Sequence, residues 1–348
     1  MAYTTIDKPS DYFNTKLYTG NGASSHAISG VGFQPDWTWN KNRSSAVNHA
    51  LTDSVRGAPL RLMSQSNDEE INQTTGLLSF NSDGFTVGSD TGYNGNGNSM
   101  VSWNWKAGTS FTNDASSTGI GSIDSAGSFN NDSGFSIVSY TGTGSNGTIK
   151  HGLNSVPSMI IVKERDNAND WKVYHHSIGN GKSLRLDTTA AQGDDSTAWN
   201  STTPTSSVFS VGTSNAVNRN GGGIIAYLFA EKQGYSKFGS YVGNGNADGT
   251  FVYTGQKSAF VMIKRTDTAK NWLILDNKRN TDDNPYNTEL VANDSRTEET
   301  NIRFDSLSNG FKLRLASGAS NVSGGNYIYM AFAENPFVTS TGVPATAR

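Results

Sequence analysis

The hexapeptide LYTGNG begins at Leu17, and two close copies, SYTGTG and SYVGNG, begin at Ser139 and Ser240. A tight turn needs glycine, but it does not need a tyrosine before it. Three copies in one chain therefore indicate a repeated structural unit. In each copy we expect the tyrosine to anchor the entry strand and the glycines to provide positive φ angles in the first turn.

Other landmarks recur in the same order. A lysine follows each tyrosine by 23 residues, in the pairs Tyr18–Lys41, Tyr140–Lys163 and Tyr241–Lys264. Eight residues later stands a ring, at His49, Trp171 or Trp272. A phenylalanine follows near the end, at Phe85, Phe209 or Phe311. Landmarks in a constant order predict three homologous units of about 90 to 100 residues.

Short segments rich in Val, Ile, Tyr, Phe, Trp and Thr, separated by Gly, Asn and Asp, predict strands. We therefore predict an all-β fold of three tandem homologous β-sandwich units, similar to jelly rolls. The small and polar stretch 107–127 explains the wider spacing between the first two units. The predicted parts are an N-terminal arm (1–11), unit 1 (12–106), a linker (107–127), unit 2 (128–233), unit 3 (234–337) and a C-terminal tail (338–348).

The strand before each lysine has two distinct faces, because side chains alternate along a strand. One face is assigned to the core and carries Trp37, Trp39, Met159, Ile161, Phe260 and Met262. The other face has Thr38 and Asn40 in unit 1, which predicts a half-exposed strand there. In units 2 and 3 that face carries the aliphatic residues Ile160, Val162, Val261 and Ile263. We predict that these four form an interface, either between units 2 and 3 or between chains.

Composition excludes several classes of protein. The formal net charge is -3, from 27 Lys+Arg and 30 Asp+Glu, so we expect no nucleic-acid partner. There is no cysteine to form disulfides. The N-terminal sequence has no apolar core typical of a signal peptide, so we expect folding in a cytoplasm. The longest apolar run, Ile224–Ala230, is too short to cross a bilayer, which predicts no membrane insertion.

Sequence signatures of enzymes are absent, and no acid, base or nucleophile recurs across the units. The pair His175–His176 is adjacent in a predicted strand, where its side chains would point to opposite faces, so it is interpreted as a polar strand end. The segment 166–170 resembles an oxygen-rich calcium loop but lacks the EF-hand glycine and glutamate, which favours an Asx-stabilised turn. We predict no enzyme activity, no catalytic residue, no metal site and no cofactor.

Two kinds of residue are candidates for binding. The three landmark lysines are interpreted as solvated strand ends, with a role in binding an acidic glycan as the alternative. Trp199 lies in a long polar segment without a strand period. A loop aromatic of this kind contacts a sugar or a partner, or it packs under its own loop. Trp199 is therefore the candidate contact with a receptor or partner.

Several segments together resemble a domain repeated in virion and tail-associated proteins of marine tailed bacteriophages, including phages of cyanobacteria. They include TKLYTGNG, GFQPDWTWNKNR, SFNSDGFTVG, GFSIVSYTGTGSNGTIKHGL, IKRTDTAKNWLILDNKR and YIYMAFAENPF. The resemblance extends from about Tyr12 to Phe337. It implies no catalytic residue.

The resemblance implies a virion structural protein, a tail fibre, a tail spike or another surface appendage that takes part in host attachment. The alternatives are a decoration or adaptor protein of head or tail and a glycan-degrading depolymerase. Expected partners are other virion proteins and a host surface glycan or receptor. We also expect a homo-oligomer, and the resemblance favours a trimer. The protein would be assembled in the host cytoplasm and located in the virion.

Overall fold

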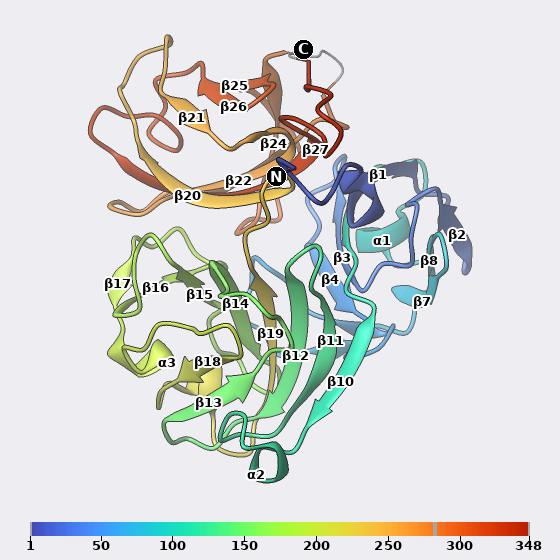
Figure 1. The fold of residues 1–348 in the computed structure, drawn as a ribbon. Coiled ribbons are helices and arrows are strands. Elements are labelled where there is room, and N and C mark those ends of the chain that lie inside the picture. The colour runs from blue at the N-terminus through green and yellow to red at the C-terminus, as the bar shows by residue number, and fades with distance from the viewer. Residues whose placement is uncertain (1, 281–283, 347–348) are drawn as a thin grey trace.

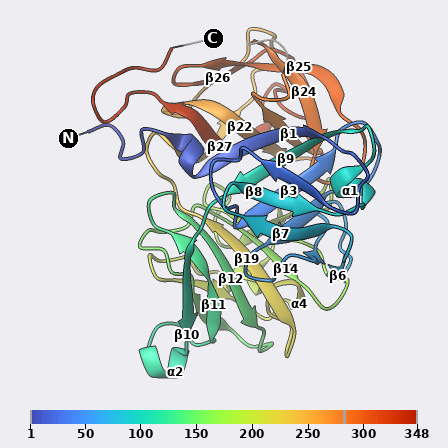
Figure 2. The same cartoon turned by 90° about the vertical axis from the view of Figure 1, so that its right-hand side faces the viewer.

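The computed structural model describes residues 2–280 and 284–346. Its regular structure is almost entirely strand, which confirms the prediction of an all-β fold. Figure 1 shows three groups of strands, with unit 3 above, unit 2 below and unit 1 to the right. In the turned view of Figure 2, unit 1 lies in front of the other two. None of the helices described here has the length and apolar character needed to cross a membrane.

Unit 1 contains a four-stranded sheet in the order β1-β9-β3-β4, a three-stranded sheet β2-β8-β7 and the short pair β5-β6. Its elements are η1 (Pro9–Asp11), β1 (Phe13–Thr19), β2 (His26–Ser29), β3 (Trp37–Asn42), β4 (Ala50–Asp53), β5 (Leu60–Arg61), β6 (Ile71–Asn72), β7 (Leu77–Asn81), β8 (Gly84–Val87), α1 (Thr91–Asn94) and β9 (Ser99–Trp105).

Unit 2 contains an eight-stranded sheet in the order β10-β11-β12-β19-β14-β15-β16-β17 and the pair β13-β18. Its elements are β10 (Thr109–Asn113), α2 (Ala115–Thr118), β11 (Ser125–Asn130), β12 (Phe135–Thr141), β13 (Gly147–Lys150), β14 (Met159–Glu164), β15 (Lys172–His175), β16 (Lys182–Arg185), β17 (Gly193–Asp194), α3 (Ser196–Trp199), β18 (Val208–Val211), α4 (Asn215–Asn218) and β19 (Gly223–Phe229).

Unit 3 is one curved eight-stranded sheet in the order β20-β27-β22-β23-β24-β25-β26-β21. Its strands are β20 (Ser236–Val242), β21 (Phe251–Tyr253), β22 (Gln256–Arg265), β23 (Trp272–Asp276), β24 (Tyr286–Val291), β25 (Glu299–Leu307), β26 (Gly310–Leu313) and β27 (Asn326–Pro336).

Four strands have the same antiparallel order in all three units. The orders are β1-β9-β3-β4, β12-β19-β14-β15 and β20-β27-β22-β23. The first strand therefore pairs with the last, and the last pairs with the strand that carries the landmark lysine. The pairing register is also the same, because the repeated tyrosine lies opposite Met100, Ile224 or Tyr327 of the last strand.

The stretch 107–127 differs from its prediction as a linker. It contains β10, α2 and the start of β11, and β10 and β11 form a hairpin that continues the sheet of unit 2. Phe111 and Phe129 hold this hairpin together, with ring centroids 5.9 Å apart. One phenylalanine among small polar residues shows no strand period, and so the strand is not recognisable in the sequence.

The repeated tyrosine has the same hydrogen bond in each unit, which answers why the motif recurs. Tyr18 Oη donates to Tyr93 O at 2.7 Å, Tyr140 Oη to Val217 O at 2.6 Å and Tyr241 Oη to Ser320 O at 2.7 Å. Each bond joins the first strand to the turn that precedes the last strand. The tyrosine thus ties the strand of the motif to the turn that leads into the last strand of the unit.

The two glycines of the motif have different roles. The second glycine has a positive φ angle in every unit, 67° at Gly22, 70° at Gly144 and 68° at Gly245, as predicted. The first glycine allows close approach of two backbones, since a Cβ at Gly20 would lie 2.2 Å from Gly95 O. A Cβ at Gly142 would lie 2.3 Å from Arg219 O. Any larger residue would therefore push the turn away from the strand.

Replacing Tyr140 by phenylalanine tests this role of the tyrosine. The change keeps the ring but leaves Val217 O without its donor in the interior. We expect the free energy of unfolding to fall by roughly 1–2 kcal/mol. Urea unfolding measures this loss, and Tyr12→Phe, whose side chain is half-buried at the edge of the core, is the matched control. An unchanged stability of Tyr140→Phe would show that the hydroxyl does not provide this tie.

The predicted core face forms one hydrophobic core that all three units share. All six predicted core residues are at most 1% exposed. Trp37 of unit 1 stacks on Tyr227 of unit 2 with centroids 4.3 Å apart. Phe13 of unit 1 stacks on Phe332 of unit 3 at 5.0 Å. We call this cluster the central core. Burial of large aromatic rings from each unit therefore holds the three units as one body.

The opposite face of each strand lies in a separate core inside its own unit. Ile160 and Val162 pack in the core of unit 2. Val261 and Ile263 pack in the core of unit 3. All four are 0% exposed, so the prediction that they form an interface between units or chains is wrong. The physical reason is that the remaining strands of the same unit cover this face.

Unit 1 also covers its second face, contrary to the prediction of a half-exposed strand. Thr38 and Asn40 are 0% exposed. Asn40 Oδ1 accepts a hydrogen bond from Tyr18 Oη, and Thr38 Oγ1 donates to Thr52 O, each at 3.4 Å. A small core around Phe85 and Tyr93 lies in the same part of the unit. Polar residues on a strand therefore do not prove exposure, although the burial of Asn40 leaves its Nδ2 without a partner among the described residues.

Candidate functional site: the contacts between units

Each landmark lysine is buried where two units meet. Its Nζ donates to a backbone carbonyl of the neighbouring unit, with N···O distances of 3.1, 3.2 and 3.1 Å in the pairs Lys41–Ser295, Lys163–Asn67 and Lys264–Thr189. It also donates to the carbonyl of the next residue in its own chain segment. The three lysines are 0% exposed, so their prediction as solvated strand ends is wrong.

This burial also shifts the pKa of the three lysines. Desolvation lowers the pKa of Lys41, Lys163 and Lys264 to about 8. The carbonyl oxygens around each Nζ favour the charged ammonium, which has three N–H groups to donate. The lysines therefore act as internal ties between units, and their location leaves them out of reach of an external glycan.

The ring eight residues after each lysine makes a second tie in the same direction. Trp171 Nε1 donates to Met63 O of unit 1 at 3.0 Å, and Trp272 Nε1 donates to Arg185 O of unit 2 at 2.8 Å. In unit 1 the ring is His49, whose Nε2 lies 3.0 Å from Val291 O of unit 3. Unit 1 thus binds unit 3, unit 3 binds unit 2, and unit 2 binds unit 1. The chain contains an approximate three-fold repetition within itself.

The hydrogen bonds of His49 define its protonation state. Its Nδ1 accepts from Trp39 Nε1 at 2.9 Å, so the proton of the neutral ring is on Nε2, which donates to Val291 O. Burial lowers the pKa of His49 to about 3. A second proton on Nδ1 would remove the bond from Trp39 as well as charge a buried ring.

An ion cluster lies at the contact of units 1 and 2, and we call it the Arg56 cluster. Arg56 pairs with Asp53 and, at 2.7 Å, with Glu70. Arg165 of unit 2 reaches the same Glu70 at 2.7 Å. Tyr227 Oη of unit 2 donates to Asp53 at 2.7 Å. The side chains of Arg56 and Asp53 are 0% exposed, so the cluster is desolvated and holds its charges in pairs.

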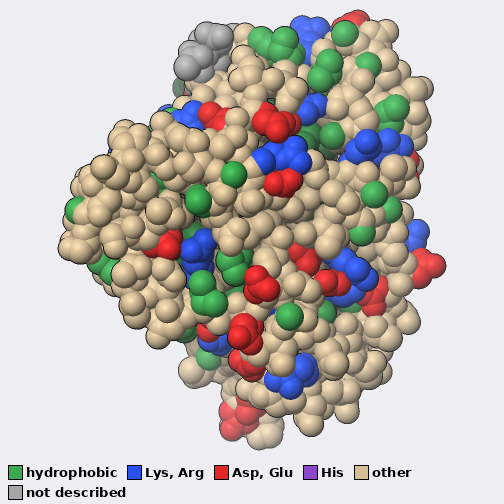
Figure 3. Space-filling view, turned by 180° about the vertical axis from the view of Figure 1, so that it is seen from behind, with side chains coloured by type: hydrophobic (Ala, Val, Ile, Leu, Met, Phe, Trp, Pro, Cys, Tyr) green, Lys and Arg blue, Asp and Glu red, His purple; other side chains and the backbone are tan. Residues whose placement is uncertain are grey.

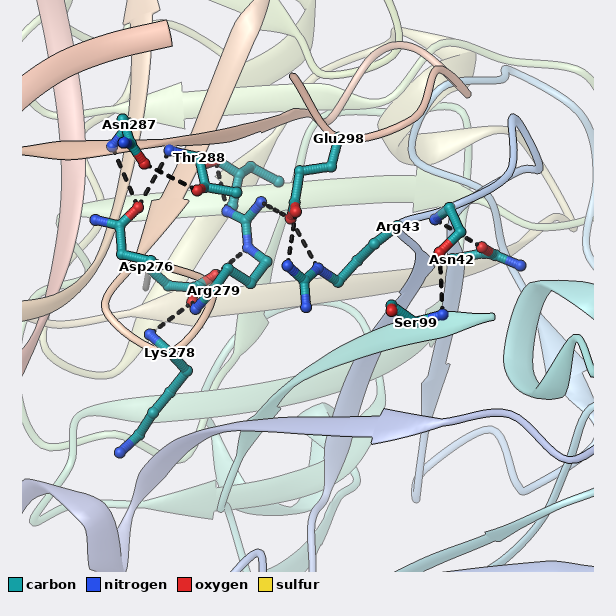
Figure 4. Close-up of polar contacts among 12 residues, drawn as sticks. Asn42, Arg43, Ser99, Asp276, Lys278, Arg279, Asn287, Thr288 and Glu298 are labelled. Carbon is teal, nitrogen blue, oxygen red and sulfur yellow. Dashed lines mark hydrogen bonds and ion pairs between the residues drawn. The ribbon is translucent and has the colours of Figure 1, made fainter. Parts of the chain in front are cut away.

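The contact of units 3 and 1 has the same arrangement, which we call the Arg279 cluster. Arg279 pairs with Asp276 and, at 3.1 Å, with Glu298. Arg43 of unit 1 reaches Glu298 at 2.6 Å. Figure 4 shows Arg43 and Arg279 approaching Glu298 from opposite sides. Trp103 Nε1 of unit 1 donates to Asp276 at 3.0 Å, in the role that Tyr227 has at the other contact.

The contact of units 2 and 3 keeps the backbone geometry but has different side chains. Gln192 N donates to Thr266 O at 2.9 Å, as Glu70 N donates to Arg165 O at 2.7 Å and Glu298 N to Arg43 O at 3.0 Å. Gln192 and Thr266 thus stand where the other contacts have glutamate and arginine. Ile178 stands three residues after His175, where Arg56 follows Asp53.

A pocket of about 370 Å³ lies at this third contact. Ile178, Gln192 and Thr266 all line it, together with residues of β16, β20 and β27. The place that arginine and glutamate side chains fill at two contacts is therefore hollow at the third. We call it the unit 2–3 pocket.

Trp199, the predicted contact with a receptor, lies in the interior. It is 2% exposed, and its Nε1 donates to Lys182 O at 3.1 Å. Its ring packs edge to face on Tyr174 with centroids 5.9 Å apart. Trp199 therefore packs under its own loop, and the prediction that it contacts a receptor or partner is wrong for this side chain.

The two adjacent histidines both point toward unit 3. His175 Nε2 lies 3.3 Å from Tyr329 O, and His176 Nε2 lies 3.0 Å from Phe238 O. Their rings stack with centroids 5.0 Å apart. The expectation of opposite faces is wrong, because His176 follows the last residue of β15 and no longer alternates with it.

The loop 166–170 is closed by its own hydrogen bonds. Asn167 and Asn169 donate side-chain N–H groups to Glu164, and Asp166 Oδ2 accepts from Gly223 N at 2.7 Å. Asp170 pairs with Arg185 at 3.1 Å. Within residues 2–280 and 284–346, no group of three or more His, Asp or Glu side chains is arranged to hold a metal ion.

Sequence reasoning missed the two ion clusters, although a signal for them exists. An aspartate followed three residues later by arginine occurs twelve residues after the lysine in units 1 and 3, at Asp53–Arg56 and Asp276–Arg279. A second arginine follows the lysine by two residues in units 1 and 2, at Arg43 and Arg165. The two patterns are complementary across each contact, but they are recognised as such only when the order of the units in space is known.

The aliphatic faces of units 2 and 3 give no support to a contact between chains, so a trimer is favoured by the resemblance alone. The aliphatic residues that suggested a contact between chains are buried within each chain. The three-fold arrangement exists among the units of a single chain. A homotrimer stays an untested prediction.

Comparison with protein-family models matches residues 8–336 to a domain of unknown function, DUF7483. Neither the curated proteins nor the solved structures contain a match to this chain.

Proposed function

We propose that this chain, which belongs to the DUF7483 family, is a bacteriophage virion structural protein that takes part in host attachment as part of a tail fibre, tail spike or other surface appendage. The resemblance of its repeated segments to virion proteins of marine phages supports the proposal. The chain would be assembled in the host cytoplasm and would contact other virion proteins.

We further propose that the three units are copies of one β-sandwich fold, similar to a jelly roll. The common strand order and the common tyrosine hydrogen bond support this origin. The common ties between units, through a lysine and a ring, support it as well.

A structural role without catalysis is supported by the use of the buried ionisable residues. The three lysines, His49 and the Arg56 and Arg279 clusters each join two units. A general acid or base needs access to a substrate, whereas the three lysines, His49, Arg56 and Arg279 are enclosed by protein. Figure 3 shows both charge signs dispersed over the face seen from behind, without a continuous basic area.

The observation that carries host attachment is a pair of aromatic side chains on β21. Phe251 is 45% exposed and Tyr253 is 53% exposed. The residue between them, Val252, is buried opposite Phe311, as Ile28 is opposite Phe85 in unit 1 and Ile149 opposite Phe209 in unit 2.

The equivalent exposed positions lack aromatic side chains in the other two units. Ala27 and Ser29 occupy them in unit 1, and Thr148 and Lys150 occupy them in unit 2. β21 is the last strand in the order of its sheet. Exposed aromatic rings present in one copy alone have no role in the shared fold, which favours contact with a partner such as a host glycan or receptor.

Competition with phage adsorption tests the proposal. Purified chain, added to the bacterium that the encoding phage infects, should slow adsorption of that phage. The double variant F251T/Y253K copies the residues of unit 2 and should lose this effect while keeping its melting temperature. Thr148→Ala in unit 2 is the matched control and should compete like the unmodified chain. Equal competition by F251T/Y253K would reject this attachment surface.

Labelling of virions with antibodies against the chain tests its location. Label at the tail tip or on surface fibres is the expected result. Label on the head or along the tail would favour the decoration or adaptor protein. Release of oligosaccharides from host envelope polysaccharide by the purified chain would favour the depolymerase and reject the role without catalysis.

A further inference from the structure

The unit 2–3 pocket lies at the contact whose side chains differ from those of the other two contacts, although the backbone geometry is the same. At the other two contacts a glutamate lies between two arginines and fills the space. Here Ile178, Gln192 and Thr266 occupy those positions. Among the described residues, no hydrogen bond or ion pair joins their side chains. A volume of about 370 Å³ remains, which is within the range of sites for small molecules.

The pocket has a mixed lining, in which six polar residues stand beside Ile178, Val242, Ile328 and two tyrosines. Ser177, Ser240 and Thr266 contribute hydroxyls, and Gln192 and Asn326 contribute amides. Ser177, Ser240 and Asn326 are exposed, so the pocket is open to solvent. Hydroxyls and amides both donate and accept hydrogen bonds, and they match a ligand with many alternating donors and acceptors.

One atom of the lining lacks a partner. Gln192 Oε1 is buried, and among the described residues no group donates a hydrogen bond to it. An unsatisfied buried acceptor is costly. Its equivalents Glu70 and Glu298 each accept from two arginines. Gln192 Oε1 is thus an acceptor for which this contact supplies no donor within the described part of the chain, whereas the other two contacts supply arginines.

The charge of the lining selects among ligands with hydroxyls. Lys182 is the single charged residue in the lining, and no ion pair is found for it among residues 2–280 and 284–346. A calcium site is usually built around carboxylates, and the lining contains no aspartate or glutamate. A half-buried lysine beside hydroxyls and amides instead favours one carboxylate on an otherwise neutral ligand.

We propose that the unit 2–3 pocket binds a uronic acid, which is a six-membered sugar ring with several hydroxyls and one carboxylate. The carboxylate would pair with Lys182, the hydroxyls would bind Gln192 and Asn326, and the C–H face of the ring would pack on Ile178. The pocket does not include Phe251 or Tyr253. The inference goes beyond the proposed function and does not depend on it.

Isothermal titration calorimetry with three probes tests the chemistry. D-glucuronate should bind at one saturable site with millimolar affinity, D-glucose should bind more weakly, and acetate should not saturate. Lys182→Met keeps the aliphatic stem and removes the charge. It should weaken glucuronate about fivefold, the value of a partly exposed ion pair, and leave glucose unchanged. Absence of saturable heat with glucuronate would overturn the proposal, as would an equal loss for both sugars in Lys182→Met.

A variant that restores the repetition tests the location. I178R/Q192E/T266R copies Arg56, Glu70 and Arg165 of the Arg56 cluster and should fill the pocket, so glucuronate binding should be lost. Ser240→Trp, at an exposed position of the mouth, should block entry without new buried charge and serves if the triple variant does not fold. Circular dichroism establishes folding of both. Unchanged glucuronate affinity in a folded Ser240→Trp variant would exclude the pocket as the site.

Discussion

Acidification from pH 6.5 to pH 4.5 is expected to lower the free energy of unfolding by about 7 kcal/mol through three buried histidines. Burial lowers the pKa of His49 to about 3, that of His151 to about 4 and that of His175 to about 3. In each ring Nδ1 accepts a hydrogen bond, from Trp39 Nε1, Leu153 N or Ser177 N. The folded protein therefore keeps these rings neutral.

The direction of this change in stability with pH follows from the number of protons that the folded and unfolded chains bind. Between the folded pKa and the unfolded value of about 6.5, the unfolded chain binds more protons, so stability rises with pH and is lost as the pH falls. Each ring approaches a slope of about 1.4 kcal/mol per pH unit only well below pH 6.5, because the unfolded ring is half protonated at that pH, and three rings together give about 7 kcal/mol down to pH 4.5. Asp187, whose pKa burial raises to about 6, opposes this loss by about 2 kcal/mol over the same range, since its folded form binds the proton first. Domains are typically stable by about 5–15 kcal/mol, so the protein should be strongly destabilised near pH 4.5.

Urea unfolding at a series of pH values measures this slope. His49→Gln removes one titrating ring and should reduce the slope by about one third. His151→Gln removes a second buried ring and should reduce the slope by a similar amount. A free energy of unfolding that is constant from pH 6.5 to pH 4.5 would contradict neutral buried histidines.

Replacing Arg56 by isoleucine is expected to cost about 3–5 kcal/mol of stability, because it leaves a buried charge without its partner. Arg56 pairs with Asp53 and Glu70 and donates to Leu51 O at 3.0 Å and Leu60 O at 3.1 Å. The side chain of Asp53 is 0% exposed. After the change only neutral donors, such as Tyr227 Oη, would face the Asp53 carboxylate.

Unit 2 indicates which second substitution should compensate for the loss of Arg56. Unit 2 has His175 and Ile178 at the positions of Asp53 and Arg56. The double variant D53H/R56I copies this pair, removes both buried charges and keeps the pair of Glu70 with Arg165. It should recover most of the stability that Arg56→Ile loses.

A surface arginine provides the control for this experiment. Arg185 pairs with Asp170, but its side chain is 48% exposed, so Arg185→Ile should cost about 0–1 kcal/mol. Denaturant midpoints of the single and double variants give the coupling between the two positions. If D53H/R56I loses at least as much stability as the sum of the single changes, Asp53 and Arg56 do not act as a pair.

The local features of the repeat were predictable from the sequence. The spacing of Tyr18, Tyr140 and Tyr241 predicted equivalent turns, and the strand pattern before the lysines predicted the core face, because both depend on local geometry and on a period of two. The all-β class followed from the same pattern. These properties are carried by neighbouring residues and need no knowledge of how the units meet.

Contacts between units were decided by tertiary structure alone. Lys41 stands at a strand end in the sequence, yet its side chain is buried. Its Nζ donates to carbonyls of its own unit and to Ser295 O of unit 3, more than 250 residues away. Ile160 and Trp199 looked available for partners, yet other strands of unit 2 cover them. The unit 2–3 pocket exists because two units meet where Gln192 and Thr266 replace charged residues. Local sequence specifies which residues are apolar or charged, but burial depends on which surface lies opposite, and that is set by the packing of all three units around one core.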